Sequence, residues 1–220
     1  MKNVNSVIGA GDCFAAVLAL GCAHGLPVRD SVRAAFEAGT EYVKNRHNRP
    51  LTLYEIHRRL DPLNAKIVDL NTILWLRSVG PFAKCRWVMT NGVHDLLHAG
   101  HVATLRAAKD MGDLLVVGLN SDASVRKLKG PDRPILPEAE RAVMLAAMEA
   151  VDFVVLFDDS PAEVARAVKP DVLVKGRDYE GKTVLGAEFA HEVAFVDLVQ
   201  NRSTTKIIKK ILKKSGEING

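Results

Sequence analysis

The feature of this sequence that most constrains its fold is a regular alternation, from about residue 86 onward, of short β-rich runs with helical patterns. Such alternation is typical of βαβ units, in which helices join parallel strands and cover the sheet. We therefore predict an α/β fold with a doubly wound parallel sheet. The predicted strands are 87–89, 114–119, 153–157, 172–174 and 194–199, and the predicted helices are 98–111, 137–150, 161–168 and 203–214.

Residues 1–60 differ from the rest of the chain, because they have helical patterns almost throughout and no strand pattern. The expected helices are 12–24, 28–46 and 53–60. After Pro62, apolar residues recur at helical spacing, which predicts a linker helix that docks onto the second unit. We place a small helical unit at 1–61, the linker helix at 62–85 and the α/β domain at 86–214.

Hydropathy, cysteine usage and charge exclude several functional classes. No apolar run reaches the ~20 residues needed to cross a bilayer, and no cleavable signal pattern is present, so we expect a cytoplasmic protein with no membrane partner. Three widely spaced cysteines argue against a disulfide framework or a structural zinc site. The net charge of +4 includes a lysine cluster at 206–214, which fits a solvated helix face better than a nucleic-acid site.

The strongest chemical signal is the run from Thr90 to His101, TNGVHDLLHAGH. It follows a predicted strand, turns at Asn91-Gly92 and enters a predicted helix, which is the arrangement of a phosphate site at a helix N-terminus. Gly100 has no Cβ and allows a nucleotide to approach closely. His98 and His101 project from one face of the first turn and can donate hydrogen bonds to phosphate oxygens.

Two other interpretations of these histidines stay open. If residues 94–101 formed one continuous helix, His94, His98 and His101 would share a face beside Asp95 and could hold a metal ion. The turn predicted at Asn91-Gly92 argues against that helix, so we expect no protein-bound metal. The histidines could also be a structural surface pair, although the preceding strand and the glycine between them favour a binding role.

The motif, with its pattern His98-x-Gly100-His101, resembles the cytidylyltransferase-like nucleotidyltransferase superfamily. Further stretches are similar to one branch, the ADP-heptose synthases (heptose 1-phosphate adenylyltransferases). The resemblance implies a Rossmann-like fold and in-line transfer of AMP from ATP, with Mg²⁺, to heptose 1-phosphate, giving ADP-heptose for lipopolysaccharide core biosynthesis and pyrophosphate. ATP and the sugar phosphate would be the chain's partners. The similar stretches are 120–124, 128–134, 140–141, 173–179 and 203–205.

The same resemblance implies roles for individual residues. His98 and His101 would bind the phosphates and stabilise the transition state, and Lys129 would be a cationic clamp. In a purely structural interpretation, Lys129 is a solvated loop lysine, Arg141 a helix-surface ion-pair partner and 203–205 a plain N-cap. The implied nucleotide-binding residues are Thr90, Asn91, Gly92, Asp95, Gly100, Asn120, Asp122, Arg141, Lys175, Gly176, Ser203, Thr204 and Thr205.

One departure from the family pattern lies inside the motif. The family usually has Cys-Phe where this chain has Val93-His94, so an ionisable ring replaces an aromatic wall beside the phosphate site. His94 is then either a third phosphate contact or a plain surface substitution.

Near the N-terminus, Gly9-Ala10-Gly11-Asp12 before a helix resembles the anion-hole motif of ribokinase-like sugar kinases. That resemblance implies phosphate-binding amides at Gly9 and Gly11 and a catalytic base at Asp12. The usual upstream Asp-Thr is Ser6-Val7 here, and only the C-terminal part of such a kinase could be present, so we predict an inactive remnant. An ordinary glycine-rich helix start is the alternative. The apolar helix faces of residues 1–60 predict that two copies of the chain pair in a homodimer.

Two further functional hypotheses accompany ADP-heptose synthesis. Within the same class, the chain could be a cytidylyltransferase acting on glycerol 3-phosphate or another polyol phosphate. In a different class, it could be a non-catalytic remnant of a fusion gene that acts as a binding or association module. Both motif histidines are present, which favours an enzyme.

Overall fold

The computed structural model of this chain describes residues 9–23, 27–44, 58, 61–78, 82–197 and 204–218. The chain divides into two compact units, Met1–Ala65 and Lys66–Gly220. The second unit includes most of the predicted linker together with the predicted α/β domain. Among the described residues, no helix is both long enough and apolar enough to cross a membrane.

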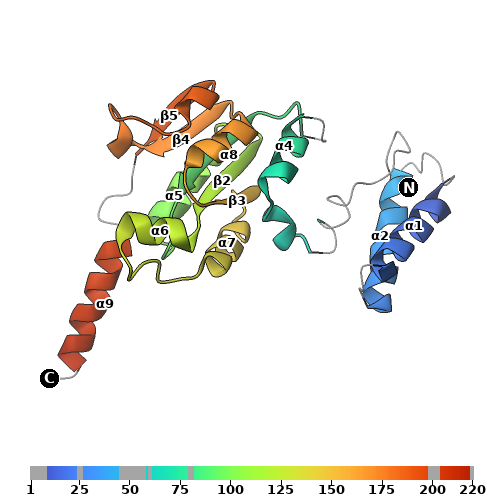
Figure 1. The fold of residues 1–220 in the computed structure, drawn as a ribbon, viewed down its shortest axis with the longest axis horizontal. Helices are drawn as coiled ribbons and strands as arrows, with labels where there is room; N and C mark the ends of the chain where they lie inside the picture. Colours follow the sequence, from blue (N-terminus) through green and yellow to red (C-terminus); the bar gives the residue numbers. More distant parts are fainter. Residues whose placement is uncertain are drawn as a thin grey trace. The chain divides into compact units, whose positions relative to one another are not determined.

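The second unit is built on a five-stranded parallel sheet (Figure 1). Its strands are β1 (Trp87–Gly92), β2 (Leu114–Asn120), β3 (Phe153–Phe157), β4 (Val172–Gly176) and β5 (Glu192–Val196). Their order is β3-β2-β1-β4-β5, and every residue of β2 is buried. The rings of Trp87 and Phe153 stack with their centroids 5.7 Å apart. This sheet confirms the predicted α/β fold class.

Helices flank the sheet, as the alternating pattern predicts. The helix predicted at 161–168 begins with a cap, because Ser160 Oγ accepts a hydrogen bond from the Ala162 N–H at 3.2 Å and Pro161 opens the helix. The elements are η1 (Asn64–Lys66), α4 (Leu70–Ser78), α5 (Ala99–Lys109), α6 (Asp122–Lys129), α7 (Glu138–Ala146), α8 (Pro161–Val168), η2 (Arg177–Tyr179), η3 (Ala187–Phe189) and α9 (Thr204–Ile218).

Several elements of the second unit differ from the sequence-based expectation, among them α7, which ends at Ala146 instead of residue 150. Helix α6 is not predicted, although Ser121 caps it by accepting a hydrogen bond from the Ser124 N–H at 3.2 Å and Gly130, with φ of +96°, ends it. Its sequence is short and mostly polar, so hydrophobic periodicity gives little signal. Strand β5 begins two residues earlier than predicted because Glu192 pairs in register with Val172 of β4. Residues 198 and 199 lie outside the described residues.

The chain changes direction at the centre of the sheet. From β1 it proceeds to β2 and β3 on one side, then returns to β4 and β5 on the other. The ladder between β1 and β4 joins Val88 to Val172 and Met89 to Leu173, whereas the ladder between β1 and β2 continues to Gly92. Open α/β sheets bind ligands at such a switch point, beyond the carboxyl ends of the strands.

The first unit contains a helical hairpin of α1 (Ala10–Ala23) and α2 (Val28–Lys44). Small residues allow the two helices to approach closely, because a Cβ atom on Gly21 would lie 2.7 Å from Ser31 Oγ. A small apolar core forms between them from Val17, Ala34, Ala35 and Ala38. Apart from Arg58, the helix predicted at 53–60 lies outside the described residues.

Apolar side chains also remain exposed on this hairpin, notably Phe36 at 66% and Leu20 at 45%. Pairing of two copies would cover these side chains. The homodimer stays a prediction. We expect deletion of residues 1–61 to convert a dimer into a monomer without loss of transferase activity, because the sheet and its motif belong to the second unit. Light scattering and an activity assay would check this, with the double variant Leu20→Ser, Phe36→Ser as a milder counterpart. An unchanged mass per particle would contradict the dimer.

Candidate active site

The predicted phosphate-binding motif begins where β1 ends. Asn91 and Gly92 still pair with β2, so the turn predicted at these residues is wrong: the strand continues through Gly92 and a loop follows at 93–98. The ladder with β2 satisfies their backbone, which outweighs the local turn preference of Asn-Gly. Helix α5 begins at Ala99, so the continuous helix from 94 to 101 that a metal cluster would need is not formed.

His98 is the N-cap residue of α5 and has an extended backbone conformation. Its Nδ1 accepts a hydrogen bond from the Gly100 N–H at 3.1 Å. Because Nδ1 is the acceptor, the proton of the neutral ring lies on Nε2, which is then a donor. The positive end of the helix dipole lies at the same place, so the start of α5 has the properties of an anion site.

Three imidazole rings gather at this helix start. The rings of His98 and His101 stack with centroids 4.0 Å apart and an angle of 16° between planes, and the His94 centroid lies 5.0 Å from that of His101. Burial, and to a smaller extent the neighbouring His98, lower the pKa of His101 to about 4. His101 is therefore neutral at physiological pH, and a neutral imidazole can donate one hydrogen bond to an anion.

Lys175, near the end of β4, contacts the end of β1. Its ammonium group donates to Asn91 Oδ1 at 2.6 Å, beyond the point where the ladder between the two strands ends. It also lies 5.2 Å from the centroid of the Tyr179 ring. Burial lowers the pKa of Lys175 to about 8, while the charge of Asp178 acts in the opposite direction. The structure thus brings two predicted site residues together, and one of them is a buried cation suited to an anionic ligand.

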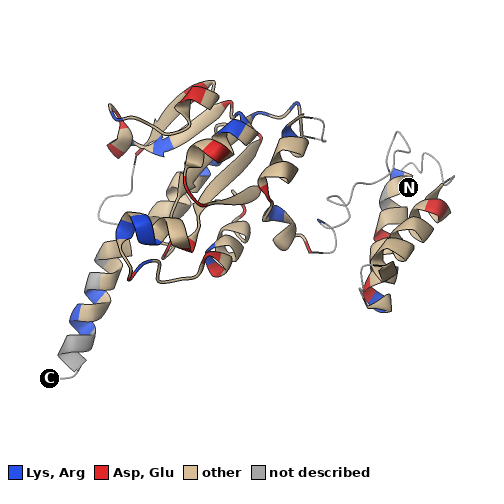
Figure 2. Ribbon diagram, viewed as in Figure 1, with Lys and Arg blue, Asp and Glu red and all other residues tan. Residues whose placement is uncertain are grey.

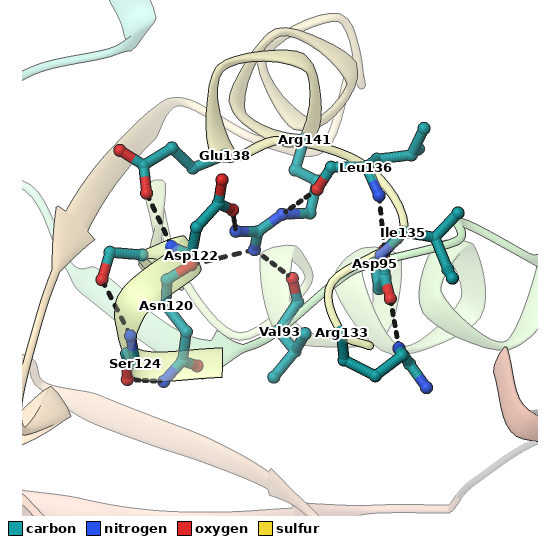
Figure 3. A network of polar contacts seen from close by, with 11 residues as sticks. Val93, Asp95, Asn120, Asp122, Ser124, Arg133, Ile135, Leu136, Glu138 and Arg141 are labelled. Atoms are coloured by element: carbon teal, nitrogen blue, oxygen red, sulfur yellow. Dashed lines mark hydrogen bonds and ion pairs between the residues drawn. The ribbon is translucent and has the colours of Figure 1, made fainter. Parts of the chain in front are cut away.

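Arg141 of α7 is fully buried in a polar network (Figure 3). Its guanidinium group donates to the carbonyl oxygens of Val93 at 2.7 Å, Asn120 at 2.9 Å and Leu136 at 2.9 Å, and it forms an ion pair with Asp122 at 2.7 Å. These bonds tie the motif loop, the end of β2 and the segment before α7 to one side chain. The structure therefore gives Arg141 a positioning role, and its predicted contact with nucleotide stays a prediction.

Asp95 has a similar internal role within the motif loop (Figure 3). Its carboxylate accepts hydrogen bonds from Arg133 Nε at 2.6 Å and from the backbone N–H groups of Ile135 at 2.8 Å and Leu136 at 3.0 Å. Burial alone would raise the pKa of Asp95, but these donors outweigh it and the pKa is lowered. Asp95 holds the segment 133–136 against the motif, and a direct contact with nucleotide stays a prediction.

Arg133 is a residue that pattern-based reasoning does not single out. Its side chain is the ion-pair partner of Asp95. The sequence does hold a signal for it, because the Asp95 carboxylate, when buried in an apolar loop, requires a partner. Arg133, a basic residue immediately before Pro134, is a candidate for that partner.

The start of α9 lies beside the motif loop. Thr204 Oγ1 donates to the Leu96 carbonyl oxygen at 3.4 Å, which places this predicted residue next to the loop 93–98. Thr205 is exposed, and Ser203 lies outside the described residues.

Three more of the predicted site residues have defined places in the structure. Thr90 and Gly100 are buried, and Gly176 is half-buried.

Basic residues lie in the last turn of α6, which is blue in Figure 2, and Arg126, Lys127 and Lys129 are all exposed. Lys127 forms an ion pair with Asp159 at 3.0 Å. Lys129 is therefore an exposed residue at a helix C-terminus rather than a loop residue, and its clamp role stays a prediction. Lys210, Lys213 and Lys214 of α9 are also exposed, as expected for a solvated helix face.

The glycine motif of the first unit has a structural explanation. Gly9 has a φ of +87°, and a Cβ atom there would lie 2.6 Å from Tyr42 Oη of α2. Gly11 lies within α1, and Asp12 is exposed in its first turn. Backbone conformation and packing thus both require glycine at position 9, whatever the role of Asp12.

Comparison with models of known protein families divides the chain into the same two parts, an N-terminal one and a longer C-terminal one. The family model "Cytidylyltransferase-like" matches residues 89–216, and the model "pfkB family carbohydrate kinase" matches residues 1–50. The crystal structure of the lipopolysaccharide core biosynthesis protein from Thermoplasma volcanium matches with 27% identity and a TM-score of 0.43, covering 52% of this chain and 99% of that one.

Longer relatives are similar in sequence to this chain along most of its length. The "Bifunctional protein HldE" of a Nitratiruptor species is 43% identical over 216 residues, covering 96% of this chain and 47% of the relative. The protein of that name from Sulfurimonas denitrificans is 44% identical over 217 residues, covering 96% of this chain and 45% of the relative. The chain thus spans about half the length of the curated relatives it matches. With a family model that covers more than half of its residues, the chain belongs to the cytidylyltransferase-like family of nucleotidyltransferases.

Proposed function

We propose that this chain transfers AMP from ATP to a sugar phosphate, D-glycero-β-D-manno-heptose 1-phosphate, and produces ADP-heptose and pyrophosphate. The observation that carries the proposal is the stacked pair of His98 and His101 at the start of α5, the helix that follows the carboxyl end of the central strand β1. The choice of heptose follows from the resemblance of the motif stretches to ADP-heptose synthases. Similarity along 96% of the chain to two bifunctional relatives is consistent with it.

In the proposed reaction, an oxygen of the sugar phosphate attacks the α-phosphorus of ATP in line, and the bond from that phosphorus to the β-phosphate oxygen breaks. The two histidines donate to phosphate oxygens on which charge increases, while Lys175 supplies a fixed positive charge. Lys129 would act as a second cationic clamp, and residues 203–205 would hold the outer phosphates at the start of the last helix. The protein contributes position and charge, and pyrophosphate leaves without a covalent enzyme intermediate.

Magnesium would enter with the nucleotide. Mg²⁺ prefers oxygen ligands, and it is commonly held by one or two carboxylates and the substrate phosphates. Among the described residues, no cluster of three potential metal-binding side chains is arranged to hold an ion, and the carboxylates of Asp95 and Asp122 already bind arginines. This arrangement fits a Mg²⁺ ion that is held mainly by the phosphates of ATP. The ion would neutralise part of the phosphate charge.

A pyrophosphate-release assay tests the proposed function. ATP and CTP would each be combined with both anomers of heptose 1-phosphate and with glycerol 3-phosphate, and reactions without acceptor would be the control. We expect release only with ATP and the β-anomer. Release with CTP and glycerol 3-phosphate would favour the cytidylyltransferase alternative, and no release with any pair would favour the non-catalytic one.

Lys175 predicts a pH dependence. Its pKa of about 8 means that the ammonium group loses its charge as the pH rises through that value. We expect kcat/KM for ATP to fall above pH 8, because this parameter reports ionisation in the free enzyme. Lys175→Met should lower kcat/KM about 10- to 100-fold at neutral pH, the usual effect of losing a charged hydrogen bond, and should remove this alkaline limb. Lys84→Met, an exposed lysine before β1, is the control.

The first unit carries a separate prediction. We expect no ATP-dependent phosphorylation of heptose 7-phosphate or of simple sugars, because Asp12 is exposed on α1 and its unit is a small helical one. A radiolabel-transfer assay with the wild-type protein would check this. Kinase turnover that disappears in Asp12→Asn would show that the remnant interpretation is mistaken.

A further inference from the structure

The ring of His94 is buried in an unusual state. Both of its ring nitrogens are inaccessible to solvent and have no hydrogen-bond partner among the described residues. A neutral imidazole has one N–H donor and one acceptor nitrogen, and each normally finds a partner when it is buried. Leaving such groups without partners destabilises the folded state, so this ring requires an explanation that packing alone does not give.

The backbone of His94 is also unfavourable. Its φ of +47° lies in the left-handed region, which residues with a side chain adopt at a cost in conformational energy. Strained residues of this kind concentrate at ligand sites, where the surrounding structure holds them in place. Here both chain neighbours are held, because the Val93 carbonyl oxygen accepts a hydrogen bond from Arg141 and the Asp95 carboxylate binds Arg133.

The ring position is fixed as well. A Cβ atom on Gly92 would lie 3.1 Å from His94 Nε2, so the glycine leaves the space that the ring occupies. On its other side, His94 contacts His101 with a centroid distance of 5.0 Å. The imidazole is thus held between the end of β1 and the first turn of α5, next to the histidine pair already assigned to phosphate binding.

Two cationic side chains, Arg141 and Lys175, lie near His94, together with the neutral ring of His101. Burial is the largest cause that lowers the pKa of His94 to about 3, and His101, Arg141, His98 and Lys175 contribute to the same shift, so the ring stays neutral. These neighbours repel a proton on His94 and attract an anion. A phosphate oxygen placed among them would accept a hydrogen bond from the ring and relieve the repulsion.

From this geometry we propose that His94 is a third phosphate ligand, whose ring binds the phosphate chain of the nucleotide together with His98 and His101. The proposal rests on the proposed function only for the identity of the nucleotide. Phenylalanine would fill the same space without two unpaired ring nitrogens, so a purely structural role gives no reason for an imidazole here.

Inorganic pyrophosphate is a suitable probe, because it carries the phosphate chemistry without nucleoside or sugar. Calorimetric titration of wild-type protein and of His94→Phe would compare the two dissociation constants. The phenylalanine keeps a planar ring and removes both nitrogens. We expect binding to weaken about 10- to 100-fold, the usual effect of losing a hydrogen bond to a charged ligand, while thermal stability is unchanged or higher.

His191→Phe is the matched control, because His191 is an exposed histidine immediately before β5, and its binding constant should not change. Equal affinities for wild type and His94→Phe, or no pyrophosphate binding by the wild type, would overturn the proposal. If His94→Phe does not fold, the comparison passes to His94→Asn and His94→Leu. The proposal then requires tighter binding by the asparagine variant, which alone can form hydrogen bonds.

The transfer assay separates this proposal from the proposed function. Pyrophosphate binding that depends on His94, without turnover of any sugar phosphate, would support the anion site and reject the reaction. Normal transfer by a protein whose pyrophosphate affinity is the same with His94→Phe would reject the third ligand alone.

Discussion

Replacement of His98 or His101 by alanine is expected to lower nucleotidyl transfer by at least ~100-fold, because each replacement removes a preorganised donor from phosphate oxygens on which charge increases. The loss should appear mainly in kcat, since the interaction strengthens in the transition state. His98→Ala also removes the cap that accepts the Gly100 N–H, so it should cost about 1 kcal/mol of stability in addition. Steady-state kinetics and urea unfolding of the same preparations would measure the two effects.

A third variant separates chemistry from the general effect of losing a histidine. His191→Ala changes an exposed histidine next to β5 and should retain wild-type kinetics. His98→Asn is informative too, because asparagine is a good N-cap residue and should restore stability without restoring the rate. A wild-type rate in either alanine variant would contradict the assignment of this histidine pair to the reaction.

Replacement of Arg141 by methionine is expected to destabilise the protein by about 3–5 kcal/mol, the usual cost of removing one member of a buried ion pair. Three carbonyl oxygens would lose a donor, and Asp122 would lose its partner. Arg141→Lys should restore little, because an ammonium group cannot reproduce the fork of donors that binds three segments. The free energy of unfolding from urea titration is the measurement.

Arg106→Met is the matched control for that experiment, because Arg106 is an exposed arginine on another helix of the same unit, α5. Its unfolding free energy should change little. A small loss in Arg141→Met, similar to that of the control, would mean that the network of Figure 3 contributes little to stability.

Much of the fold follows from local sequence patterns. The strand at 153–157 and the helix at 161–168 have the predicted bounds, because a short apolar run and a marked cap each specify their element. Helix α6 has no apolar run, and its cap alone is too weak a signal to predict a helix. At Asn91-Gly92 the local preference for a turn is overridden by pairing with β2, which no local pattern reports.

The candidate site is less accessible to such reasoning, since its contacts join distant parts of the chain. The motif indicates His98 and His101, but nothing near Asn91 in sequence reveals that Lys175 lies 2.6 Å away from its side-chain oxygen. Arg141 lies on the same helical face as Ala142 and Leu145, but its charge predicts an exposed position. Its burial follows from the meeting of three segments, which only the assembled fold determines.

The strand order also has a consequence for the folding of this protein. β1 can pair early with β2, its neighbour along the chain, but its other partner, β4, follows only after β3 and two further crossovers. Pairings between strands far apart in sequence are slow to form, because a long loop must close first. A ribosome-bound chain that ends before residue 172 therefore has His98 and His101 without Lys175. If the proposed site is correct, we expect tight nucleotide binding to appear only after β4 has paired with β1.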